Sequence, residues 1–177
     1  MGESMTGPER SDSAPQRRAA VFFVGNKLKL DDGIGPAAYD LFLETYVVGP
    51  EVELFDVGCM SLDMIRFVEK CDFILTVDAV DGSGHPAGTV FRFSPDDMAR
   101  TSGPRDSLHD LKLADLFDAA LLLGYECDGW CVGMQVENMV PAELVIGLTP
   151  PCNDALPLLV DAAAAELDRR GFPVSRK

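Results

Sequence analysis

The feature that most constrains the fold is a short, continuous apolar run at residues 19–24, AAVFFV, which stops at Gly25 and Asn26. Apolar side chains on both faces are typical of a strand buried within a parallel sheet. Parallel strands are joined by crossovers that are usually helical, so helices are expected to follow such a strand. A second uncharged run at residues 73–77 has the same character. The sequence therefore predicts an α/β fold.

Further periodic segments fill in the sheet and its covering helices. Pro36 suits a first helical turn, and apolar residues at helical spacing follow it until near Gly49. Helices are expected at 36–49, at 61–70 with Ser61 as its cap, at 110–123, and at 154–170 before Gly171; strands are expected at 52–57, 89–93 and 131–136. The short Gly/Pro loop before residues 89–93 predicts an antiparallel edge strand. These segments predict a three-layer sandwich around a twisted, mostly parallel five-stranded mixed sheet.

The distribution of charge and cysteine limits the organisation and the partners of the chain. Residues 1–18 have little to bury and read as a disordered leader, residues 19–171 as a single α/β domain, and residues 172–177 as a tail. The net charge of −14 argues against a nucleic acid partner, and no apolar run is long enough to cross a membrane. Five cysteines without a CxxC pair predict buried thiols in a reducing, cytoplasmic protein.

Two carboxylates in the glycine-bearing loop after the first strand are the first candidates for chemistry. A phosphate cradle needs bare amides at the start of the helix, whereas this loop places Asp31 and Asp32 there. Carboxylates at a strand-to-helix turn suit a cation instead, and we expect Asp32 to be the ligand and Asp31 to be structural. The alternative for both residues is that they cap the following helix.

Asp78 and His109 are the other candidates. Asp78 ends the apolar run 73–77, where a carboxylate needs water, a donor or a metal as its partner. His109 stands at the expected start of a helix, where it could equally be an ordinary cap residue, and His85 lies in a Gly-rich loop and reads as incidental. Because ligand sites in open α/β sheets lie beyond the carboxyl ends of the strands, we expect Asp32, Asp78 and His109 to meet at one sheet edge and hold a divalent metal.

Several segments between Val21 and Arg170 together resemble the hydrogenase maturation endopeptidases, which trim the large-subunit precursor of nickel-iron hydrogenases. The segments that carry this resemblance are GN at 25–26 with DDGIG at 31–35, VDAVDG at 77–82, SLHDL at 107–111, GMQVE at 133–137 and IGLT at 146–149. In that family the matching acidic and histidine residues ligate the metal, which again selects Asp32, Asp78 and His109. Family members often have Glu where this chain has Asp32 and usually lack so long a leader.

The resemblance implies a peptidase that removes a C-terminal extension from the hydrogenase large-subunit precursor. It also implies that nickel already bound to the precursor is what the protease recognises. The chain contains no HExxH or GxSxG motif, so a metal-polarised water, or Asp32 or Asp78 as general base, is expected to drive the attack. The alternatives are a non-enzymatic nickel-sensing assembly factor for the large subunit and, more weakly, a nucleotide-binding domain.

Overall fold

A computed structural model describes residues 17–58, 64–94, 97 and 113–177. A five-stranded sheet lies at its centre, with the strand order β3-β1-β4-β6-β5. The strands are β1 (Ala19–Val24), β3 (Val52–Gly58), β4 (Phe73–Val80), β5 (Val90–Phe93) and β6 (Asp128–Gln135). All neighbours are parallel except β5, which pairs antiparallel with β6. The expected mixed, mostly parallel sheet is confirmed, including its antiparallel edge.

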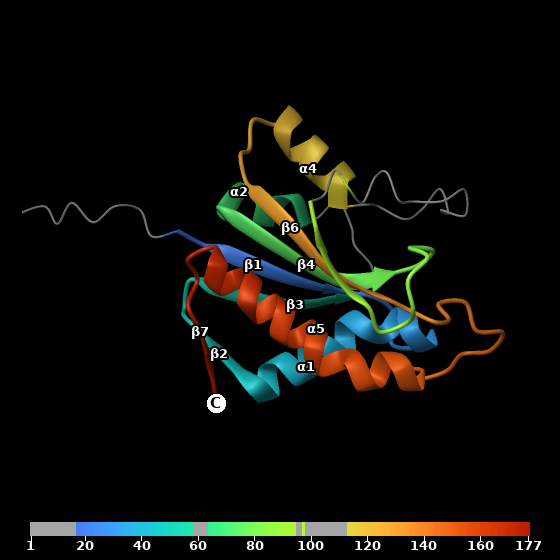
Figure 1. Cartoon of the computed structure of the whole chain (residues 1–177). Helices are drawn as coiled ribbons and strands as arrows, with labels where there is room; N and C mark the ends of the chain where they lie inside the picture. The colour runs from blue at the N-terminus through green and yellow to red at the C-terminus, as the bar shows by residue number, and fades with distance from the viewer. Residues whose placement is uncertain (1–16, 59–63, 95–96, 98–112) are drawn as a thin grey trace, which may run out of the picture.

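Helices cover both faces of the sheet, so the molecule has three layers (Figure 1). On one face lie α1 (Ile34–Thr45) and α5 (Pro150–Arg169), and on the other lie α2 (Ile65–Lys70) and α4 (Leu113–Leu122). Alternation along β1 explains both cores, because Phe23 packs towards α1 and α5 whereas Phe22 packs towards α2 and α4. Within the part of the chain that the structure describes, none of the helices combines the length and apolar character that a membrane span requires.

Several expected boundaries differ from the structure. The helix α1 stops at Thr45, and the next residues form β2 (Tyr46–Val48), which pairs antiparallel with β7 (Val174–Arg176) in a second, two-stranded sheet. The helix α5 begins four residues earlier than expected, because prolines are compatible with a first helical turn. The expected starts of two helices, at Ser61 and at residue 110, lie outside the described residues.

The C-terminal residues belong to the folded unit. Residues 172–177, expected to be a tail, include the buried Phe172, which stacks on Phe73 with ring centroids 6.0 Å apart. At the other end of the described chain, the backbone N–H of Arg18 donates to the Asp72 carboxylate at 2.8 Å. The domain therefore reaches from about residue 17 through β7.

Candidate functional site

The first candidate ligand, Asp32, lies in a 3-10 turn, η1 (Leu30–Gly33), which connects β1 to α1 at the carboxyl end of β1. The loop folds back on itself, since the N–H of Asn26 donates to the carbonyl of Asp32 at 3.0 Å. Gly25 has φ +140°, and a Cβ there would lie 1.9 Å from the same carbonyl oxygen. Only glycine permits this close approach, which places η1 against β4.

The second candidate ligand, Asp78, lies within β4, two residues before the strand ends at Val80. The expectation that the strand stops before Asp78 is therefore wrong, because β4 continues in register with β6 and pairs Asp78 with Gly133. The side chain alternates with Val77 and so faces the α2 and α4 side of the sheet, half-buried. A carboxylate inside a strand loses more of its hydration than one in a loop.

Burial and a neighbouring charge act together on Asp78. The pKa of Asp78 is raised to about 7, mainly by burial and to a smaller extent by the negative charge of Asp32, while a 2.7 Å hydrogen bond from the N–H of Ala79 acts in the opposite direction. The two candidate carboxylates are thus close enough for one to repel the ionised form of the other. A cation between them would relieve this repulsion and favour the ionised form of both.

The third candidate ligand, His109, lies outside the described residues. Within residues 17–58, 64–94, 97 and 113–177, no three His, Cys, Asp or Glu side chains gather closely enough to hold a metal ion. Asp32 and Asp78 supply two oxygen donors, which fit a divalent cation only if further ligands come from elsewhere. The three-residue metal site stays a prediction.

Asp31 has the structural role expected of one of the paired aspartates, but it is not a helix cap. Its fully buried carboxylate accepts hydrogen bonds from the N–H groups of Glu137 (3.1 Å), Asn138 (2.9 Å) and Thr149 (2.7 Å) and from the Thr149 hydroxyl (2.9 Å). Burial alone would raise the pKa of Asp31, but these four bonds outweigh it and the pKa is lowered. Asp31 therefore ties the first loop to residues 137–149.

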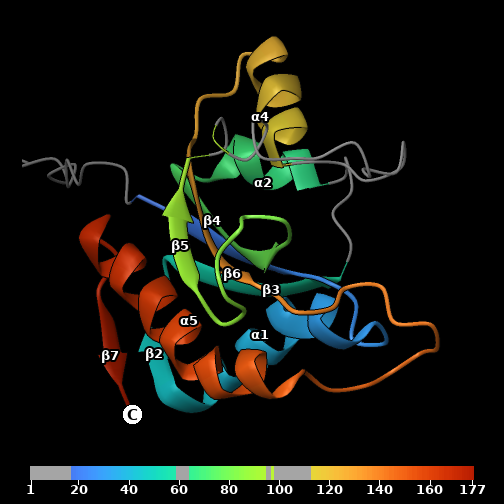
Figure 2. The ribbon, with the colours of Figure 1, turned by 45° about the vertical axis from the view of Figure 1, so that its right-hand side comes forward.

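Backbone contacts extend this tie. The N–H of Leu30 donates to the carbonyl of Val145 at 2.8 Å, and the N–H of Val145 donates to the carbonyl of Leu28 at 2.9 Å. Lys29 and Val145 consequently form an isolated parallel bridge. The segment that carries Asp32 is held between the sheet and the 137–149 segment, which lies beside it in both views (Figures 1 and 2).

Gln135 lies in the GMQVE segment at 133–137, and the structure shows a role for it that the sequence alone does not predict. It is buried at the end of β6, and its side-chain oxygen accepts hydrogen bonds from the N–H and the hydroxyl of Ser83. This contact holds the glycine-rich loop that follows β4 and Asp78. The sequence offers one indication of this role: Gln135 is a polar residue at the end of an otherwise mostly apolar strand. A buried side-chain amide requires a hydrogen-bond partner.

The described cysteines are poor nucleophiles. Cys131 and Cys152 are buried, as expected, and burial raises the pKa of both thiols. Burial also raises the pKa of Cys127 to about 12, which leaves it protonated at neutral pH. His85 is exposed and packs edge-on to Phe91, with ring centroids 5.2 Å apart. None of these four residues adds to the site at Asp32 and Asp78.

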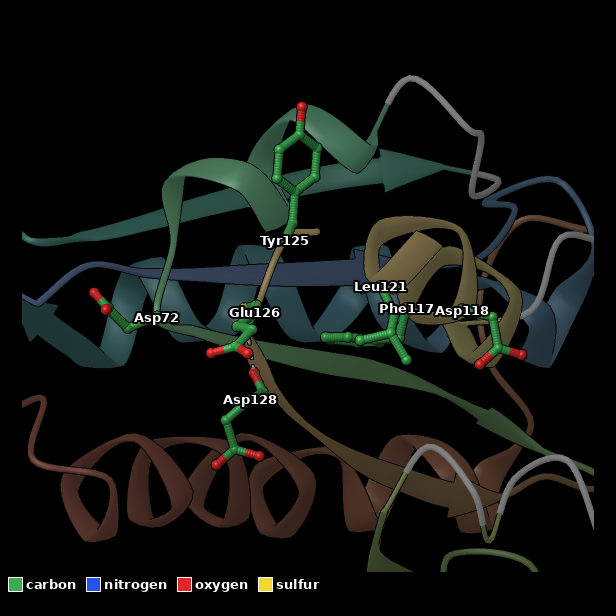
Figure 3. A pocket seen from close by; sticks show the side chains of 8 residues that line it. Asp72, Phe117, Asp118, Leu121, Tyr125, Glu126 and Asp128 are labelled. Atoms are coloured by element: carbon green, nitrogen blue, oxygen red, sulfur yellow. Dashed lines mark hydrogen bonds between the residues drawn. The ribbon is translucent and has the colours of Figure 1, made fainter. Parts of the chain in front are cut away.

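A cavity of about 460 Å³ lies elsewhere, between α4 and the beginnings of β4 and β6 (Figure 3). Its lining includes Asp72, which immediately precedes β4, and Asp128, the first residue of β6. These residues mark the amino ends of the strands, whereas Asp32 and Asp78 lie towards the carboxyl ends. The cavity is thus separate from the candidate site.

Comparison with known proteins gives a consistent result. The sequence pattern of one family, described as hydrogenase maturation protease, matches residues 41–166. The hydrogenase expression/formation protein HupD of Bradyrhizobium diazoefficiens is 30% identical over 166 residues, covering 93% of this chain and 85% of that protein. The hydrogenase 2 maturation protease of Escherichia coli is 25% identical over 155 residues, covering 87% of this chain and 93% of that protein.

A solved structure supports the fold. The hydrogenase maturating endopeptidase HybD from Escherichia coli superimposes with a TM-score of 0.80 at 24% identity, covering 90% of this chain and 98% of that one. At this level of identity the likeness establishes the α/β architecture.

Proposed function

The chain belongs to the hydrogenase maturation protease family, and from that membership we propose that it removes the C-terminal extension of a nickel-loaded hydrogenase large-subunit precursor. The observation that supports this proposal is the pairing of Asp32 with Asp78 at the carboxyl ends of the strands, where the charge of one raises the pKa of the other. Carboxylates that repel one another in the free protein attract a cation that reaches them on a substrate. Membership of a protease family sets aside the non-enzymatic assembly factor.

The donor set explains why the metal is proposed to arrive with the substrate. Two carboxylates and one imidazole, if His109 completes the set, offer few ligands and no thiolate, so the free protein is expected to hold nickel weakly. Nickel bound between both proteins would supply Lewis acidity and an anchor shared with ligands of the precursor. Loaded precursor would then bind more tightly than metal-free precursor, which couples recognition to metal loading.

The residues of this chain have definable tasks in such a site. Asp32 is positioned by its folded-back loop, and Asp78 by the ladder between β4 and β6. Nickel between them would favour the ionised form of both carboxylates, and an ionised Asp32 or Asp78 beside the metal could accept a proton from the attacking water. The described cysteines are buried or protonated, so a thiolate nucleophile from them is not part of the proposal.

Mass spectrometry of the precursor tests the proposal. Nickel-loaded and metal-free precursors are incubated with the protein at matched concentrations, and the masses of the products are compared. Cleavage of the loaded form alone is expected, and both Asp78→Asn and His109→Ala should abolish it while retaining a cooperative melting transition. Equal cleavage of both forms would show that nickel is not the recognition element, and Asp32, Asp78 and His109 would then need another role.

A further inference from the structure

Five exposed apolar side chains gather on the two loops that Asp31 joins. They are Leu28, Val140, Leu144, Val145 and Ile146, with exposed fractions of 44%, 86%, 74%, 38% and 79%. We call this set the apolar rim. Isolated exposed apolar residues are normal, but several of them on two adjoining loops are typical of an interaction site. The rim is therefore unlike an ordinary solvated loop.

The rim also departs from the charge pattern of the chain. Charged residues make up 25% of the sequence, yet Glu143 is the only charged residue in the twelve positions 138–149. In a protein with a net charge of −14, such an uncharged segment is a local exception. A surface of this kind favours contact with an apolar polypeptide surface and gives no advantage to a charged ligand.

The rim includes a residue of the loop that carries Asp32. Leu28 lies four residues before Asp32, and the backbone bonds between Leu28, Leu30 and Val145 join the two loops side by side. The buried Asp31 carboxylate fixes the start and the end of the 137–149 segment to the same loop. Figure 2 shows this segment projecting from the molecule next to the loop that follows β1. A protein that reaches Asp32 with its scissile segment would therefore lie within reach of the rim.

We propose that the apolar rim is the docking surface for the large-subunit precursor and that it binds an apolar patch of that protein beside the segment to be cut. This inference rests on the proposed function, because it takes the precursor as the occupant. A protease with a folded substrate needs contacts beyond the scissile bond to orient it, and the rim provides them without charge. Residues of the rim act on binding, and Asp32 and Asp78 act on the reaction.

Steady-state cleavage of the nickel-loaded precursor by the full chain tests the docking surface. The double variant Val140→Ser/Ile146→Ser is compared with Leu158→Ser, a control at a 57% exposed position on α5. Loss of two exposed apolar contacts is expected to raise KM by roughly tenfold or more while kcat stays within about twofold. The control should change neither value.

The outcomes separate the docking surface from the proposed function. If the wild-type protein fails to cut the loaded precursor, the proposed function fails. If the wild-type protein cuts it and the double variant has an unchanged KM, the docking surface alone is overturned. Sedimentation of the free protein covers the other occupant, since a dimer that the double variant dissociates would assign the rim to a second copy of the chain. Melting curves and the single variant Ile146→Ser show whether a loss reflects misfolding.

Discussion

Replacing Asp78 with Asn is expected to stabilise the metal-free protein while abolishing its activity. The two side chains have nearly the same shape, and the Asn carbonyl can still accept the 2.7 Å hydrogen bond from the N–H of Ala79. What changes is the charge, which burial and then Asp32 disfavour, raising the pKa of Asp78 to about 7. Asp78, the proposed metal ligand, therefore lies where its ionised form destabilises the metal-free fold.

The magnitude and its pH window follow from that shift. A carboxyl whose folded pKa is above its unfolded value of about 3.9 stabilises the fold below that value and loses the contribution as pH rises through about 7. The difference between a folded pKa of about 7 and an unfolded pKa of about 3.9 corresponds to about 4 kcal/mol, and solvent around the half-buried carboxyl reduces this to roughly 1–3 kcal/mol. The variant should thus gain stability over the wild type as pH rises from 4 to 8.

Urea unfolding of chelator-treated protein at pH 4.5, 6 and 8 measures the effect. The difference in free energy of unfolding between Asp78→Asn and the wild type should be smallest at pH 4.5 and largest at pH 8. Glu44→Gln, on the exposed side of α1, provides a matched removal of one charge. If Asp78→Asn is no more stable than the wild type at pH 8, burial does not disfavour the charge of Asp78. The argument that Asp32 and Asp78 attract a cation would then fail.

Three further predictions concern the surroundings of the site. Asp31→Ala should lower the free energy of unfolding by roughly 3 kcal/mol, because the N–H groups of Glu137, Asn138 and Thr149 lose the carboxylate that accepts their hydrogen bonds. Since the pKa of Asp31 is lowered by these bonds, its stabilisation is present above pH 4 and declines as pH falls further, and urea unfolding across that range measures both effects. Asp32→Asn should lower the pKa of Asp78, because the charge of Asp32 raises it. NMR of metal-free protein with labelled carboxyl groups measures this pKa, and an unchanged value would contradict the proximity of the two side chains. Gly35→Ala should prevent soluble expression or lower the melting temperature sharply, because a Cβ there would lie 1.9 Å from the carbonyl oxygen of Val24, and a wild-type melting curve would refute this.

The sheet was predictable because its signals are local. The uncharged runs of β1 and β4 have apolar residues on both faces, and a strand with that pattern is stable only when it is covered on both sides. Gly25, Gly33 and Gly35, which flank Asp32, also predict a tight turn between strand and helix. These features depend on residues within about ten positions of one another.

The features that were missed depend on distant partners. The strand β2 follows α1 directly and looks like its last turn, and only pairing with β7, more than 120 residues later, makes it a strand. The role of Asp31 likewise comes from donors 106 to 118 residues away. The sequence predicted a structural Asp31, but the donors that hold its carboxylate could be identified only from the three-dimensional contacts. His109 falls outside the described residues, and its role stays a prediction.

The two outer strands of the sheet bear on how a partner polypeptide can be captured. The edge strand β5 has four residues. Its Arg92 forms an ion pair with the buried Glu166 of α5, and the guanidinium carbon of Arg92 lies 3.8 Å from the ring centroid of Trp130. At the opposite edge, Asp56 of β3 is paired with Lys27 at 2.9 Å. The shortness of β5 and the charged side chains on both edge strands discourage the addition of a foreign strand. An extended peptide therefore gains little by joining this sheet as a further strand, which protects the protein from aggregation through its own edges. The proposed substrate would instead be received at the carboxyl ends of the strands.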